Sequence, residues 1–79
     1  MTDEERLASL EAQAEKAYAK MYEVRHPSDI TACYSDAKES LYDAIPLAEH
    51  LGRDAEAKRL RARLANIKGV FRPQFVSFT

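Results

Sequence analysis

The sequence predicts an all-α protein, an antiparallel three-helix bundle followed by a non-helical apolar C-terminal tail. Strong helix formers dominate the 79 residues, whereas the strand formers Val and Ile are scarce. Apolar residues recur at alternating steps of three and four, which is the spacing of one helix face. Pro27, Gly52 and Pro73 interrupt this periodicity. We therefore expect three helices in a single domain (1–79), over residues 3–25, 28–51 and 55–72.

The first expected helix begins at a capping box. Thr2 can accept a hydrogen bond from the amide of Glu5, and the Glu5 side chain can reach back to the amide of Thr2. The helix should end near Arg25, because Pro27 disfavours helical backbone at the residue before it. The apolar stripe between these signals consists of Leu7, Leu10, Ala14, Ala17, Met21 and Val24.

The second expected helix starts at Ser28 or Asp29, either of which can act as the N-cap. Pro46 falls inside its stripe, and because the stripe keeps its phase we expect a kink rather than a break. Gly52 is the expected C-terminal cap. The stripe consists of Ile30, Tyr34, Ala37, Leu41, Ala44, Ala48 and Leu51.

The third expected helix is capped by Asp54 and ended by Pro73, with Gly69 as a weak point inside it. Its stripe consists of Ala57, Leu60, Leu64, Ile67 and Phe71. Short connections make consecutive helices antiparallel neighbours, and the common period favours a left-handed bundle. The alternative is a long hairpin of the first two helices that completes its core in a dimer.

Size, cysteine content and hydropathy indicate where the protein is located and whether it needs a partner chain. A domain of this length hides only about 60% of the surface of its unfolded chain, which favours a partner chain. Cys33 is the only cysteine, so no internal disulfide can form, and a reducing compartment is expected. No apolar run approaches the ~20 residues of a membrane span, and the acidic start does not resemble a secretion signal. We expect a cytoplasmic protein with no membrane contact.

Parts of the chain resemble known helical modules. Residues 34–52 (YSDAKESLYDAIPLAEHLG) resemble the second helix of a tetratricopeptide repeat and the middle helix of the microtubule-interacting-and-transport domain. The resemblance implies a helical module that binds peptide segments of partner proteins, and it assigns no binding residue here. Residues 64–75 (LANIKGVFRPQF) also look like the end of small uncharacterised bacterial proteins, which implies no function.

Charge is divided unevenly along the chain. Residues 1–51 contain five Lys or Arg against eleven Asp or Glu, whereas residues 52–79 contain seven against two. Arg59 and Arg63 flank the third stripe, where they can pair with acidic residues of the other helices. Four further basic residues are expected opposite the stripe, where they suit nucleic-acid binding as an alternative function: Lys58, Arg61, Lys68 and Arg72.

Aromatic residues supply the candidate protein-binding surface. Tyr18 and Tyr22 lie one turn apart beside the first stripe, either as the rim of the core or as a patch that a partner recognises. The apolar residues at the C-terminal end either fold back on the bundle or dock on another chain. The partner-binding candidates are therefore Tyr18, Tyr22, Phe71, Phe75, Val76 and Phe78.

The sequence offers no constellation typical of an enzyme. Cys33 flanks the second stripe, which favours a small buried residue over a nucleophile. Glu23 and His26 form a Glu-x-x-His pair, but a di-metal bundle needs two such pairs and two further glutamates. We expect no catalytic residue, metal or cofactor. The leading hypothesis is a non-catalytic helical protein–protein interaction module, which either self-associates or binds another protein.

Overall fold

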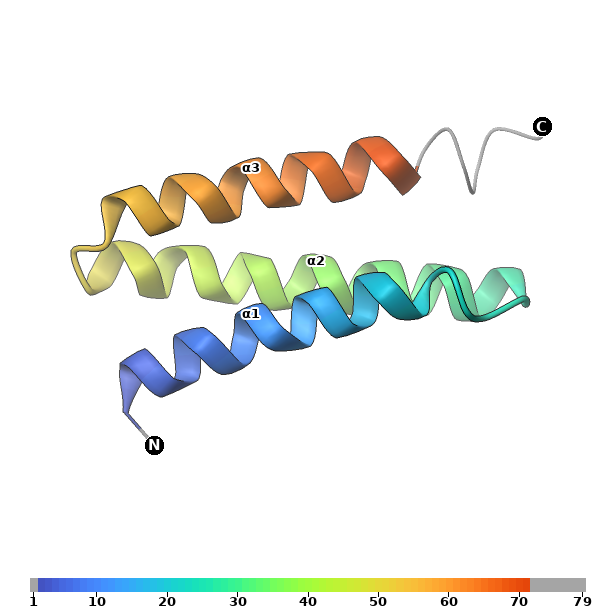
Figure 1. Ribbon diagram of the computed structural model, residues 1–79, viewed down its shortest axis with the longest axis horizontal. Coiled ribbons are helices and arrows are strands. Elements are labelled where there is room, and N and C mark those ends of the chain that lie inside the picture. Colours follow the sequence, from blue (N-terminus) through green and yellow to red (C-terminus); the bar gives the residue numbers. More distant parts are fainter. Residues whose placement is uncertain (1, 72–79) are drawn as a thin grey trace.

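The computed structural model describes residues 2–71, with side chains through Val70. Three helices make up most of this part: α1 (Asp3–Lys20), α2 (Pro27–His50) and α3 (Asp54–Phe71). α1 and α3 run parallel to each other and antiparallel to α2, which lies between them (Figure 1). The predicted all-α three-helix bundle is therefore confirmed. The tail residues Phe75, Val76 and Phe78 lie outside the described residues.

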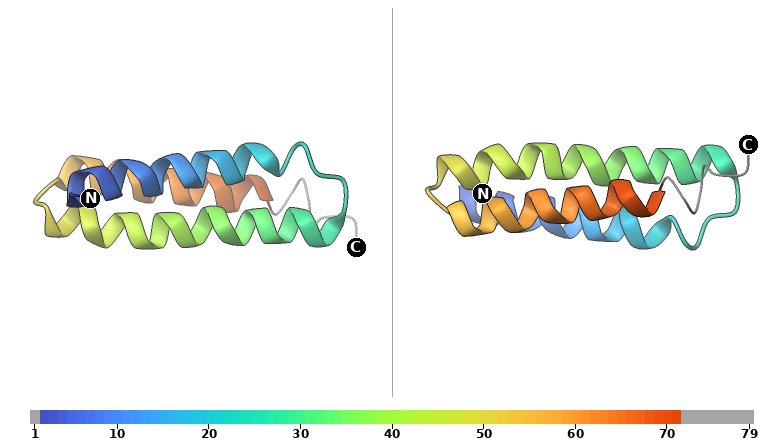
Figure 2. Two further views of the ribbon diagram at one scale, coloured as in Figure 1. Left: turned by 90° about the horizontal axis from the view of Figure 1, so that it is seen from below. Right: turned by 90° about the horizontal axis from the view of Figure 1, so that it is seen from above.

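The bundle is open on one side. α2 packs along both of its neighbours, whereas α1 and α3 approach each other through few residues. Figure 2 shows that α1 and α3 are both displaced toward the same side of α2. The helices therefore form two packed pairs that share α2, and the space between α1 and α3 is spanned by long side chains.

The shared core depends on a row of small side chains on α2. Ala37, Ala44 and Ala48 are fully buried, and their lack of bulk lets both neighbouring helices approach closely. Leu41 is also fully buried between them. The rest of this core consists of Ile45 on α2 and, from the flanking helices, Leu7, Ala14, Ala57, Leu60, Leu64 and Ile67. All of these positions except Ile45 belong to the three predicted stripes, so the predicted periodicity places most of the core correctly.

α1 ends at Lys20, five residues before the predicted end at Arg25. The backbone tightens after this point, because the amides of Tyr22 and Glu23 donate to carbonyls only three residues back, at 3.2 Å and 3.0 Å. Met21 nevertheless stays fully buried. The predicted start is confirmed, since the amide of Glu5 donates to Thr2 Oγ1 at 3.1 Å.

α2 begins at Pro27, one residue earlier than predicted. The N-cap is His26 and not Ser28 or Asp29. Proline suits the first position of a helix because its ring fixes φ near the helical value and its missing N–H leaves no unpaired donor. His26 has the extended backbone that a following proline favours, and its carbonyl accepts from the amides of Asp29 and Ile30, both at 3.0 Å.

The helix continues through Pro46, which lies on its exposed side, so the predicted absence of a break is confirmed. The predicted kink stays a prediction. At the end of α2, Gly52 has a φ of +75°. Its amide donates to Glu49 O at 3.0 Å, and the amide of Arg53 donates to Ala48 O at 2.9 Å. This pattern is a Schellman motif, so the predicted glycine cap is confirmed. α3 then starts at Asp54, which is the first helical residue rather than the cap before it.

Candidate functional site

Arginine–glutamate pairs bridge the gap between α1 and α3. Arg63 donates from Nε to Glu15 Oε2 at 2.8 Å and from Nη2 to Glu15 Oε1 at 2.7 Å. Arg53 reaches Glu4 at 2.6 Å, at the opposite end of the interface. Arg59 pairs with Glu11 between these two. Since α1 and α3 are parallel, these pairs repeat at nearly constant sequence separation and form one ladder along the gap.

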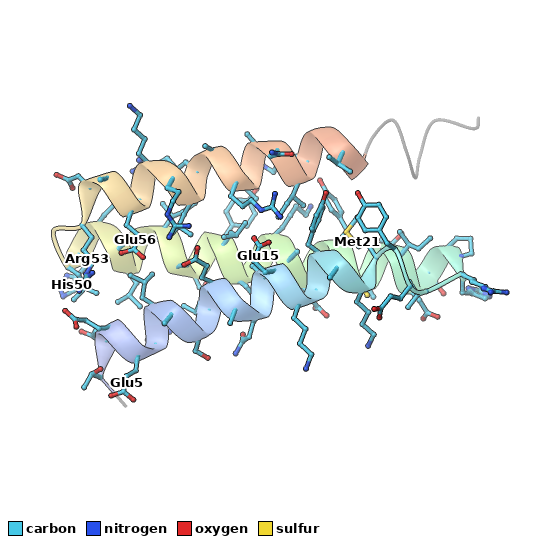
Figure 3. The ribbon with its side chains drawn as sticks, in the orientation of Figure 1. Glu5, Glu15, Met21, His50, Arg53 and Glu56 are labelled. Carbon is cyan, nitrogen blue, oxygen red and sulfur yellow. The ribbon has the colours of Figure 1, made fainter. Side chains whose placement is uncertain are left out.

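Glu56 extends the ladder within α3. Its carboxylate lies 3.6 Å from Arg53 and 3.3 Å from Arg59, one turn away in each direction. Figure 3 shows Glu15 and Glu56 pointing into the space between α1 and α3, whereas Glu5 points away from it. The hydrogen bond from Arg59 lowers the pKa of Glu11. The predicted pairing of Arg59 and Arg63 with acidic residues is confirmed, and it explains part of the charge division.

The structure brings Tyr18 and Tyr22 together beside this ladder. Their hydroxyls lie 3.0 Å apart, and their rings pack edge to face with centroids 5.5 Å apart. The guanidinium of Arg63 lies over the Tyr18 ring, 4.7 Å from its centroid. Tyr18 is half-buried against the core, whereas Tyr22 is 53% exposed. The hydrogen bond with Tyr18 raises the pKa of Tyr22. The other partner-binding candidates are not placed, because the Phe71 side chain lies outside the described residues, as do residues 72–79.

The other side of α3 carries lysine–tyrosine contacts. The Lys68 ammonium lies over the Tyr42 ring of α2, 5.1 Å from its centroid. Within α2, Lys38 lies over the Tyr34 ring, 4.4 Å from its centroid. The hydrogen bond between the Tyr42 and Lys68 side chains lowers the pKa of Tyr42 and raises the pKa of Lys68. Tyr42 is 48% exposed, so the surface that it forms with Lys68 is accessible to solvent.

The nucleic-acid candidates do not share one free face. Lys58 is exposed, as expected. Arg61 is half-exposed but pairs with Glu49 of α2. Lys68 lies half-buried at the contact with α2, rather than opposite the buried stripe as expected. Arg72 lies outside the part of the chain that the structure describes. Apart from Lys58, the basic residues of α3 whose side chains the structure describes are thus divided between contacts with α1 and contacts with α2.

Cys33 and His26, which were considered for catalysis or metal binding, have structural roles. Cys33 is buried on α2, as predicted. His26 caps α2, and its Nδ1 lies 2.9 Å from Ser28 Oγ. Among the residues that the structure describes, no group of three or more His, Cys, Asp or Glu side chains is arranged to hold a metal ion.

An open groove that the sequence did not predict lies on the outer side of the α1–α2 pair. It has a volume of about 460 Å³, and half-buried Leu10 and Ala17 contribute its apolar part. Lysines line one rim and carboxylates line the other, namely Lys16 and Lys20 on α1, and Asp36, Glu39 and Asp43 on α2. Within each set the residues recur at helical steps of three or four, so the sequence indicates that each set lies on one face of its helix. The sequence does not indicate that the two faces line the same groove.

None of the helices in the described residues is long and apolar enough to cross a membrane. No family model, curated protein or solved structure matches this chain. Its function is therefore argued from the surfaces described above.

Proposed function

We propose that this chain is a non-catalytic helical module for protein–protein interaction, and that Tyr22, with Tyr18 and Arg63 behind it, forms its contact surface. The observation that carries the proposal is the exposure of Tyr22 on a preorganised support. Its ring packs on Tyr18, its hydroxyl is within hydrogen-bond distance of the Tyr18 hydroxyl, and the Arg63 guanidinium covers the Tyr18 ring. Tyrosine and arginine are the side chains that most often dominate binding energy at protein interfaces.

The support matters because it reduces the entropy that binding would cost. An exposed aromatic side chain that is already held by its neighbours loses little rotamer freedom when a partner covers it. Arg63 is itself fixed by two hydrogen bonds to Glu15. The chain of contacts from Glu15 through Arg63 to the two tyrosines therefore holds an apolar surface with polar edges. We place the module in the cytoplasm, because its one cysteine is free and suits a reducing compartment.

The test is an affinity purification with Tyr22→Ala and a matched control. Tyr42→Ala is the control, because Tyr42 is exposed to a similar extent but lies at the α2–α3 contact. A protein retained by the wild type and by Tyr42→Ala but lost with Tyr22→Ala would support the proposal. Retention by both variants, with unchanged circular dichroism, would show that Tyr22 is not the contact residue.

Nucleic-acid binding through α3 is the alternative, and it has weaker support. Arg53, Arg59, Arg61 and Arg63 already pair with carboxylates, which reduces the positive potential that phosphate would meet. A salt titration of binding to a fluorescent single-stranded oligonucleotide tests it. Binding that weakens with salt and with Lys58→Glu would favour this alternative over the protein module.

A further inference from the structure

We propose that the groove between α1 and α2 binds the same groove of a second copy of this chain, with a two-fold axis parallel to the helices. The proposal deepens the interaction function, because it names a second copy as a partner. It uses a different surface from Tyr22, however, since Tyr18 packs toward Arg63 of α3 and the groove lies on the outer side of the α1–α2 pair. The two proposals can therefore fail separately.

The charged side chains around the groove are not engaged by ion pairs within the described part of the chain. The ion pairs there use glutamates at the α1–α3 gap and at the α2–α3 contact, and none involves a charged residue of the groove. Lys16 and Lys20 are exposed on one rim, and Asp36, Glu39 and Asp43 are exposed on the other. The open groove keeps the two rims apart, so both remain available to a second molecule.

The two rims are also complementary to themselves. A two-fold interface brings the same surface of two copies together, so each charged residue of one copy must face a residue of opposite charge on the other copy. Rotation by 180° about an axis along the groove exchanges the two rims. The lysine rim of one copy then lies over the acidic rim of the other, and the contact occurs twice. A perpendicular in-plane axis would place like charges together.

The register agrees with this axis. α1 and α2 are antiparallel, so Lys20 and Asp36 both lie toward the connection between them, and Lys16 and Glu39, one turn along each helix, lie farther from it. Rotation about an axis along the helices keeps these levels, which places Lys20 opposite Asp36 of the second copy and Lys16 opposite its Glu39. Each helix of the resulting four-helix layer has antiparallel neighbours across the interface and within its own chain, an arrangement typical of four-helix bundles. Leu10 and Ala17 of each copy would then be covered by the groove of the other copy.

The experiment measures mass by sedimentation velocity at low ionic strength, with two charge-reversal variants of the full chain. Lys16→Glu with Lys20→Glu makes both rims acidic, and Asp36→Lys with Glu39→Lys makes both rims mainly basic. Each variant alone should be monomeric, because like charges would face each other across the two-fold axis. An equimolar mixture should dimerise again, because both rim contacts then join opposite charges. Added salt should weaken the wild-type dimer, since exposed charges are screened over about 10 Å at 0.1 M.

A control variant, Arg25→Glu with Lys58→Glu, makes the same change in net charge as the lysine reversal, at exposed positions outside the groove. It should dimerise as the wild type does, as should Tyr22→Ala. A wild type that stays monomeric at high protein concentration would overturn the inference. So would a mixture of two folded variants that remains monomeric, or a reversal variant that dimerises alone. None of these results bears on partner capture by Tyr22, which the preceding experiment tests.

Discussion

Arg63 of α3 donates two hydrogen bonds to Glu15 of α1 while its guanidinium covers the ring of Tyr18. The Arg63 side chain is 31% exposed and that of Glu15 is 45% exposed. Arg63 therefore does two things at once, since it connects α1 to α3 and it supports the aromatic surface at the end of α1. The stability of the bundle and the shape of its candidate contact surface are coupled through this residue.

This coupling predicts the result of a double-mutant cycle. Arg63→Met keeps an unbranched apolar stem but removes the charge and the hydrogen-bond donors, and Glu15→Gln keeps the shape of the carboxylate. We expect a coupling free energy of about 1 kcal/mol, at the upper end for partly exposed pairs because the contact is bidentate. Urea denaturation of the four proteins measures it. Lys58→Met, at an exposed position, should change stability by less than about 0.5 kcal/mol. Additive effects of the two mutations would mean that the ion pair does not stabilise the fold.

Stability should also fall in acid because of Glu11. The hydrogen bond from Arg59 lowers the pKa of Glu11 in the folded state below its ordinary value of 4.5. A lowered folded-state pKa adds stability above the unfolded value, and this contribution disappears as the pH falls through the folded-state pKa. Glu11→Gln should therefore cost stability at pH 7 and cost less as the pH drops below 4.5. Denaturation of both proteins between neutral and acidic pH gives the difference. A difference that does not change with pH would contradict the prediction.

The two glycines predict opposite effects of the same substitution. Gly52→Ala should destabilise by about 1 kcal/mol, because its φ of +75° is strained for any residue with a Cβ. Gly69→Ala should stabilise by about 0.5–1 kcal/mol, because Gly69 lies inside α3 with open space where the added methyl group would lie. Thermal melts should separate the two variants by roughly 4–8 °C per kcal/mol. A loss of stability with Gly69→Ala would indicate a neighbour that the methyl group displaces.

The sequence predicts the parts of this fold that depend on local chemistry. The N-cap at Thr2 and the glycine cap at Gly52 require only neighbouring residues, and both are present as predicted. The Glu5 carboxylate, however, accepts from the Thr2 hydroxyl and not from the Thr2 amide that a capping box uses. The end of α1 was misplaced because Pro27 constrains only the residue before it, whereas the backbone tightens at Tyr22, where no residue type signals a helix end. The predicted N-cap of α2 is wrong because Pro27 not only disfavours helix before it but also occupies the first position of the next helix.

The candidate surfaces depend on how the helices are rotated about their axes, which the sequence does not determine to better than a residue or two. Lys68 follows the buried Ile67, and one residue turns a helix by about 100°. That rotation takes Lys68 to the flank of the stripe, where Tyr42 of α2 lies, rather than to the outer face. The groove rims were missed for a related reason. Lys16 and Asp43 look like ordinary solvent-exposed residues until the packing of α1 on α2 places them around one groove.

The small side chains of α2 give the last prediction. Ala44 is fully buried where α2 contacts its neighbours, so a larger side chain has no space without separating the helices. Ala44→Leu should destabilise by about 1–3 kcal/mol, although leucine is a strong helix former and more apolar. Ala12→Leu is the matched control, because Ala12 is exposed on α1 and the same substitution there should change stability by less than about 0.5 kcal/mol. Urea denaturation measures both. An Ala44→Leu protein as stable as the wild type would mean that the helices can move apart at no cost, and that close approach at Ala44 does not hold the two packed pairs together.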